Sequence, residues 1–359
     1  MLNQQFINFR VDDAKMHFQQ FFNIPADRSL LHVVRVRYWY AGIKKKTGLT
    51  TAYQLEHHFE PLDKTKVDKR TPPRNKWSKY EAGKHKPNSS LARKVNIKVP
   101  GSFRELDHPL WEVLRLDERV LPDIDTWMEK LESRVQEVVY KQSHDGVTPL
   151  KLRLGYRPAL SRSLVKLGNM DALTALLLYW LESKHLEQVN NTRFQARCIY
   201  QLLLMMGIDF IDRNMAEEFF VLFLVRVFNC TDWDDRLFGI TPAHYVQGTK
   251  LLYCLLYSVE DLKPFASWTS RCQAMYRLLE GRKGLDVEFG LGVVLEANWR
   301  FGPPTERQWT AWHYEYTNWL WGWTHLNLGS KGRFPDDELW KSLNNSTDTH
   351  RGDSHLSSV

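Results

Sequence analysis

The sequence predicts an all-α protein, and three observations support that prediction. Apolar residues recur at intervals of three and four along most of the chain, as they do on one face of a helix. Glycine, asparagine, serine and threonine stand where such stretches would begin or end. The strict alternation and the two-residue turns of paired strands are nearly absent. With 43% hydrophobic and 13% aromatic residues among 359, the chain has enough apolar area to fill a large core.

The first predicted helices follow an expected N-terminal extension, residues 1–30. Apolar residues at helical spacing predict a helix over 33–46: Val36, Trp39, Tyr40 and Ile43. Gly48 then stands where a glycine in the left-handed conformation ends a helix. Thr50 or Thr51 offers an N-cap for a second helix over 52–59.

The next segment combines a charged connection with two further helices. Residues 60–73 are charged and end in two prolines, which predicts a loop or a small hairpin. A third helix is expected over 74–82, with Trp77 and Tyr80 as its buried pair and Gly83 as its end. A fourth helix, 88–95, begins at Asn88 or Ser89, and Pro100 with Gly101 closes the segment.

The rest of the chain is predicted to form one large helical domain over 105–343 and a disordered tail over 344–359. The spacing of its helices leaves room for a degenerate α-solenoid. Helices are expected near 109–116, 120–141, 159–166, 169–186, 191–206, 214–228, 242–258, 263–281, 284–297, 305–325 and 336–343.

Positive charge is concentrated near the N-terminus. Residues 31–104 contain eighteen Lys/Arg against five Asp/Glu, which leaves +13, while the whole chain carries +7. The remaining residues therefore sum to −6. Such an asymmetry is typical of a module that binds a polyanion. A solvated basic surface without a ligand is the alternative reading of charge alone.

Residues 75–87 resemble the recognition helix and following turn of Cro/C1-type (XRE-like) helix-turn-helix domains. The pattern there is polar, polar, apolar, polar, polar, apolar, Glu, x, Gly, then three residues and Pro. Trp77, Tyr80, Gly83 and Pro87 are the residues that would form the structural core of the motif. The resemblance implies a basic helix-turn-helix module over 31–104, with an enlarged turn of about ten additional residues at 60–73.

The resemblance also implies roles for the polar residues. The third helix would lie in the major groove, where each base pair presents a distinct pattern of donors and acceptors. Arg74 would face guanine and Asn75 adenine. The expected DNA-binding residues are Thr50, Thr51, Gln54, Arg74, Asn75, Lys76, Ser78, Lys79, Lys84 and Lys86. In addition, Lys64, Lys66, Lys69 and Arg70 of the connection would form a basic wing.

Several classes of protein are not indicated. The four cysteines, Cys198, Cys230, Cys254 and Cys272, lie far apart in apolar helical contexts, which predicts buried free thiols. No secretory signal and no apolar run of about 20 residues is present, so we expect a cytoplasmic protein with no membrane partner. Asp232, Asp234 and Asp235 form an acidic loop without a further ligand. The sequence therefore predicts no metal, no cofactor and no enzyme.

The helix predicted over 305–325 has a mostly aromatic face, which indicates core packing or a protein partner. Its residues at helical spacing are Trp309, Trp312, Tyr316, Trp319, Leu320 and Trp323. A partner or a second copy of the chain would meet part of this surface, while His313 and His325 beside it are expected to be structural.

The sequence thus predicts a sequence-specific protein that binds double-stranded DNA, either a transcriptional regulator or a DNA-targeting subunit of a bacterial assembly. The helical domain would serve a homodimer or a protein partner. Two alternatives stay open. In the first, the chain would be a helical scaffold whose basic module binds RNA or an acidic protein. In the second, it would be an enzyme with a site in the helical domain.

Overall fold

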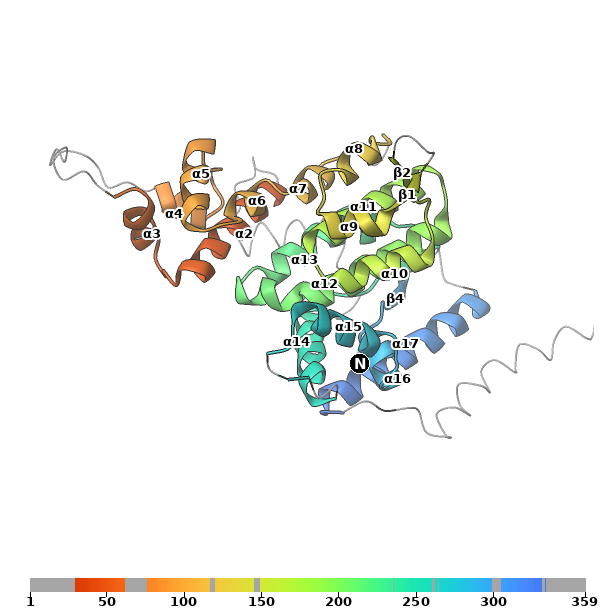
Figure 1. Cartoon of the computed structure of the whole chain (residues 1–359). Coiled ribbons are helices and arrows are strands. Elements are labelled where there is room, and N and C mark those ends of the chain that lie inside the picture. The colour runs from red at the N-terminus through yellow and green to blue at the C-terminus, as the bar shows by residue number, and fades with distance from the viewer. Residues whose placement is uncertain are drawn as a thin grey trace, which may run out of the picture. The chain divides into compact units, whose positions relative to one another are not determined.

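The prediction of an all-α fold is confirmed by a computed structural model, in which helices far outweigh strands (Figure 1). The structure describes residues 30–61, 76–116, 120–144, 149–234, 236–259, 262–263, 265–298, 305–330 and 333. The chain divides into two compact units. Unit 1 is the N-terminal part up to Leu131 together with Asp209–Arg226, and unit 2 is Glu132–Ile208 with the residues after Arg226.

Unit 1 contains the expected 31–104 segment and extends beyond it. It takes in two short helices that follow the segment and, from much later in the chain, the last turn of α12 and the whole of α13. Its helices are α2 Leu30–Thr47, α3 Ala52–Phe59, α4 Lys76–Glu81, α5 Ser89–Lys98, α6 Ser102–Leu106, α7 Pro109–Val113, α8 Ile124–Met128 and α13 Ala216–Arg226.

The N-terminal helices of unit 1 share one apolar core. Figure 1 shows α3, α4 and α5 grouped beside α2. Every one of these helices, and α6, contributes fully buried side chains to it: Val36, Trp39, Ile43, Leu55, Phe59, Trp77, Tyr80, Leu91, Val95 and Leu106. Trp77 stacks on Phe59 with ring centroids 5.4 Å apart and on Trp39 at 6.1 Å. This aromatic contact fixes α4 against α2 and α3.

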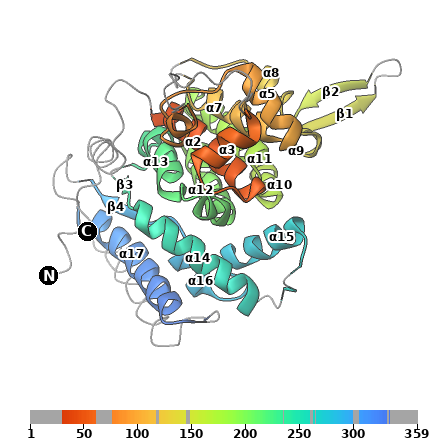
Figure 2. The ribbon, with the colours of Figure 1, turned by 90° about the vertical axis from the view of Figure 1, so that its left-hand side faces the viewer.

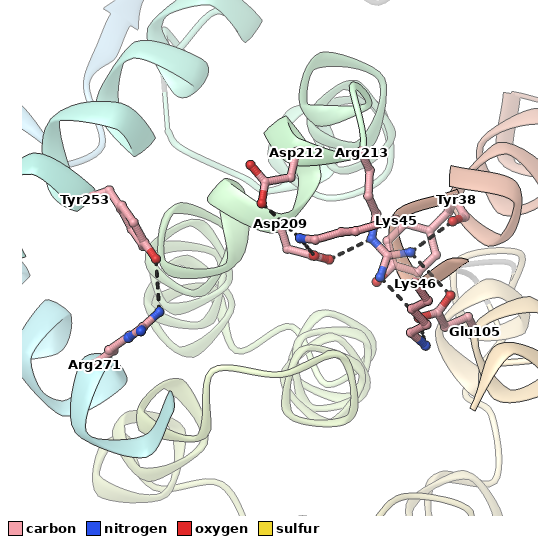
Figure 3. A network of polar contacts seen from close by, with 9 residues as sticks. All are labelled: Tyr38, Lys45, Lys46, Glu105, Asp209, Asp212, Arg213, Tyr253 and Arg271. Carbon is pink, nitrogen blue, oxygen red and sulfur yellow. Dashed lines mark hydrogen bonds and ion pairs between the residues drawn. The ribbon is translucent and has the colours of Figure 1, made fainter. Parts of the chain in front are cut away.

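A buried guanidinium joins α2 and α6 to the end of α12 within unit 1 (Figure 3). Arg213 donates to Asp209 at 2.8 Å, to Glu105 at 3.1 Å and to the carbonyl of Tyr38 at 3.1 Å, and it lies over the ring of Tyr38. Gly42 makes room for it, because a Cβ there would overlap the guanidinium. Burial raises the pKa of Tyr38, so its hydroxyl stays protonated.

Unit 2 is built around α11, which is buried on almost all sides, as its apolar sequence Ala172–Leu181 requires. Figure 2 shows α14, α16 and α17 together in this unit. Its helices are α9 Ser133–Val139, α10 Pro158–Leu167, α11 Met170–His185, α12 Val189–Asp212 up to Ile208, η1 Phe228–Cys230, α14 Pro242–Ser258, α15 Trp268–Leu279, α16 Leu285–Gly290 and α17 Glu306–Asn327.

Two antiparallel two-stranded sheets in unit 2 depart from the predicted helices. Strand β1, Tyr140–His144, pairs with β2, Pro149–Arg153, and β3, Arg236–Phe238, pairs with β4, Leu295–Ala297. The helix expected over 120–141 is therefore wrong, since α8 and α9 are separate and β1 follows. The helix expected over 284–297 is also wrong beyond Gly290. A helix over 336–343 lies outside the described residues.

The aromatic residues of α17 form a ladder along the helix. Consecutive rings of Trp309, Trp312, Tyr316, Trp319 and Trp323 have centroids 5.0 to 6.0 Å apart. His244 of α14 packs against Trp319 and Trp323. Leu320, which the sequence placed on the same face, is 44% exposed. His325 is structural, with its Nδ1 2.8 Å from the carbonyl of Trp321.

Two further findings concern apolar segments. By length and composition, α12 is the one helix in the described part of the chain that could cross a membrane, and most of its apolar stretch is buried, as in the core helix of a soluble protein. All four cysteines are free thiols. Cys198 and Cys272 are buried as predicted, whereas Cys254 is exposed because it falls on the outer side of α14.

Candidate nucleic-acid interface

The start of α3 is organised by three of the predicted DNA-binding residues. The Thr51 hydroxyl accepts a hydrogen bond from the amide of Gln54 at 3.2 Å. In return, Oε1 of Gln54 accepts from the amides of Thr50 and Thr51 at 2.9 and 3.1 Å, which completes a capping box. All three residues are exposed. Their positions leave the Gln54 amide nitrogen and the Thr50 side chain at the surface.

The predicted apolar pair of α4 faces the core of unit 1. Trp77 is fully buried and Tyr80 almost so, while Ser78 and Lys79 between them are exposed. Burial beside Glu60 and Glu56 raises the pKa of Tyr80 to about 12, so this residue packs as a neutral phenol. The alternation means that α4 presents only a short polar face to solvent.

The turn after α4 is a Schellman motif. The Lys84 amide donates to the carbonyl of Lys79 at 2.8 Å, and the Gly83 amide donates to Tyr80 at 2.9 Å. Gly83 has φ +68°, and a Cβ on it would lie 2.7 Å from Cγ1 of Val33. Pro87 is buried, and Asn88 then caps α5 through the amide of Leu91. Glycine and proline thus fix the path from α4 to α5.

Lys76 is a predicted DNA-binding residue whose charge is paired within unit 1. Its Nζ lies 2.8 and 3.0 Å from the two carboxylate oxygens of Glu60. Trp77 donates its indole N–H to the same carboxylate at 3.1 Å. Lys76 therefore neutralises a charge inside unit 1. Lys86 is also paired, with Asp107 at 3.2 Å, although both are exposed.

Several predicted residues are not placed by the structure. Arg74 and Asn75, which the resemblance assigns to base contacts, lie outside the described residues. The same holds for the basic wing, Lys64, Lys66, Lys69 and Arg70, and for the connection 62–73. The predicted residues that the structure does place lie at the N-terminal cap of α3, on the polar face of α4 and in the turn that follows α4.

At least seven of the thirteen Lys and Arg residues that the structure describes in the 31–104 segment form ion pairs within unit 1. Arg35 pairs with Asp107 and Glu112, and Arg37 pairs with the buried Glu218. The run at the end of α2 is paired as well: Lys44 with Glu81, Lys45 with Asp209 and Asp212, and Lys46 with Glu105. The formal charge of the segment therefore overstates the positive charge that a ligand would meet.

Four exposed cations of the 31–104 segment have side chains with neither an ion pair nor a hydrogen bond to another described residue. They are Lys79 on α4, Lys84 in the turn, and Arg93 and Lys94 on α5. We call Lys79 and Lys84 the α4 cations, and Arg93 and Lys94 the α5 cations. The α5 cations were not among the predicted DNA-binding residues. The apolar residues Leu91, Ala92 and Val95 recur at helical spacing, and this pattern could have shown that Arg93 and Lys94 lie on the outer face of the helix.

The other charged clusters that the sequence drew attention to are internally neutralised. Arg193 contacts both Asp232 and Asp234, and Asp235 lies outside the described residues. His57 packs against the exposed ring of Tyr53, with centroids 4.2 Å apart. Among the residues that the structure places, no group of three or more His, Cys, Asp or Glu side chains could hold a metal ion.

No family model matches the chain, and no match was found among curated proteins or solved structures.

Proposed function

We propose that unit 1 binds double-stranded DNA through the α3–α4 helix pair, used as a helix-turn-helix. The observation behind the proposal is the division of charge. Glu60, Glu81 and Glu105 of unit 1 pair with lysines of the same unit, while Lys79 and Lys84 are exposed and unpaired within the described residues. A duplex carries one phosphate charge per about 1.7 Å of its axis, and unpaired surface cations are what such a polyanion attracts.

The polar face of α4 suits contact with DNA. Ser78 and Lys79 point outward between two buried aromatic residues, so the helix is anchored while these side chains reach the ligand. At the start of α3, the exposed Thr50 and the amide nitrogen of Gln54 suit phosphate contacts, because a helix N-terminus also carries partial positive charge. Phosphate contacts would position the chain, and base contacts would supply specificity.

The cellular role that fits this activity is a cytoplasmic transcriptional regulator or a DNA-targeting subunit of a larger assembly. Unit 2 has a separate core and offers its surface to a second copy or to a protein partner. The exposed apolar side chains of Phe265 and Leu328 support such an association.

The test is binding of a labelled duplex of about 30 base pairs by the full chain and by two double variants. Lys79→Ala/Lys84→Ala removes the α4 cations. Arg282→Ala/Lys283→Ala removes two adjacent exposed cations of unit 2 and is the matched control. The proposal requires the first variant to lose affinity while the control keeps it. Equal behaviour of the two variants, or tighter binding of single-stranded RNA than of duplex DNA, would overturn it.

A further inference from the structure

Helix α5 has an outward face that the α3–α4 proposal does not use. Its buried positions are Leu91, Ala92 and Val95. The opposite face is exposed and consists of Ser90, Arg93, Lys94 and Ile97, at the spacing of successive helical turns. With ten residues, α5 is about 15 Å long, against about 9 Å for the six residues of α4. The longer exposed polar face in this region therefore belongs to α5.

The charge of this face is positive only. No acidic residue occurs in α5, and the α5 cations have no ion pair with any other residue that the structure describes. Lys98, at the end of the helix, is used differently. It donates to the carbonyl of His58 at 2.5 Å and lies 5.7 Å from the ring centroid of Phe59. Lys98 thus ties α5 to α3, and Arg93 and Lys94 stay turned to solvent.

The faces of α4 and α5 belong to one rigid core. Leu91 and Val95 pack in the same apolar cluster as Trp77 and Tyr80. The connection between the helices is fixed by the Schellman turn, the buried Pro87 and the Asn88 cap. The two helices are therefore held in a fixed arrangement, and a ligand that contacts both outward faces would require no rearrangement of the chain.

We propose that α5 forms a second contact with the DNA duplex, in which Arg93 and Lys94 each neutralise one backbone phosphate. The proposal rests on the proposed function and extends it to residues outside the helix pair. Exposed, unpaired cations on a rigid helix match the charge of a phosphate backbone. The apolar Ile97, 80% exposed on the same face, places an uncharged side chain where the duplex would lie.

The expected effect follows from counterion release. Each phosphate contact adds about 0.9 to the slope of log affinity against log salt, so Arg93→Ala/Lys94→Ala should flatten the slope by about two. At about 0.15 M salt this corresponds to roughly thirtyfold weaker binding. The unfolding midpoint in urea should not change, because both side chains are exposed and unpaired among the described residues.

The experiment measures binding of the same labelled duplex at several salt concentrations. The full chain is compared with Arg93→Ala/Lys94→Ala, Lys79→Ala/Lys84→Ala and the unit 2 control Arg282→Ala/Lys283→Ala. A second probe, Ile97→Glu, introduces a repelling charge on the α5 face, and Leu186→Glu in unit 2 is its control. The proposal expects both α5 variants to weaken binding while both controls leave it unchanged.

Two outcomes overturn the inference, and they are distinguishable. If the α4 variant loses affinity while the α5 variants keep the affinity and slope of the unaltered chain, α5 does not touch the duplex and the proposed function stands. If the unaltered chain does not bind the duplex, the proposed function and the inference fail together.

Discussion

The Nζ atom of Lys76 lies 2.8 Å from Oε1 of Glu60, so a cation expected to face DNA is held by the chain's own carboxylate. The two residues lie on either side of the connection between α3 and α4. Their ion pair, with the Trp77 indole on the same carboxylate, ties the two helices together. Lys76 is thereby a structural residue of the helix pair, and Lys79 becomes its principal exposed cation.

Lys76→Ala should therefore affect mainly the stability of the fold, and Lys79→Ala should affect mainly DNA binding. Lys76→Ala breaks an ion pair and should lower the free energy of unfolding, by less than about 1 kcal/mol because the pair is partly solvated. Lys79→Ala should leave stability unchanged and weaken DNA binding more. Urea unfolding and duplex binding of the two variants decide the matter. A larger loss of binding for Lys76→Ala would return that residue to the interface.

Gly83→Ala should destabilise unit 1 more than Gly48→Ala does. Both glycines have a left-handed φ, +68° and +70°, which costs an alanine about 1 kcal/mol. Nothing lies within 4 Å of a Cβ at Gly48, whereas one at Gly83 would press on Val33. We expect about 1 kcal/mol for Gly48→Ala and about 2–4 kcal/mol for Gly83→Ala in urea unfolding. Equal losses would mean that the contact with Val33 relaxes freely.

Arg213→Met should be among the most destabilising charge removals in unit 1. The Arg213 side chain is 6% exposed and its loss leaves Glu105 and Asp209 with fewer partners. Removing one member of a buried ionic cluster costs about 3–5 kcal/mol. Lys45→Met removes a 44% exposed cation from the same cluster and should cost much less. Thermal or urea unfolding that ranks the two variants the other way would show that the cluster is solvated.

Glu296→Gln should change how the stability of unit 2 depends on pH. Burial raises the pKa of Glu296 to about 7 from 4.5. The folded state then holds the proton more tightly, so this contribution is full below about pH 4.5 and is lost as pH rises through 7. The loss is at most about 3 kcal/mol. The glutamine variant should gain stability over the unaltered chain between pH 5 and pH 8, and parallel pH curves would argue against a buried carboxyl.

Helix positions could be predicted where local signals were complete. The first residues of α3 and α14 match their predicted positions because threonine N-caps, Thr51 and Thr241, precede them. The pairing of β3 with β4 could not be predicted, because the two strands are more than fifty residues apart and neither is long enough to show alternation. The β1–β2 hairpin has a connection longer than the two-residue turn that was sought.

The candidate site was predictable in its charge but not in its pairing. Lys45 meets Asp209 and Asp212 more than 160 residues away, so counting charges along the segment could not show that it is neutralised. The exposed position of Arg93 and Lys94 could have been predicted, because both lie within the predicted helix 88–95 on the face opposite Leu91, Ala92 and Val95. Because tertiary contacts neutralise many cations of the basic segment, the candidate interface is limited to a few of its residues.

The most direct test of the account is the salt dependence of duplex DNA binding by the full chain. Lys79, Lys84, Arg93 and Lys94, the four cations without a partner among the described residues of the 31–104 segment, predict that log affinity falls against log salt with a slope of about −3.6. Binding that is absent, or that does not change with salt, would contradict the claim that unit 1 is a DNA-binding module.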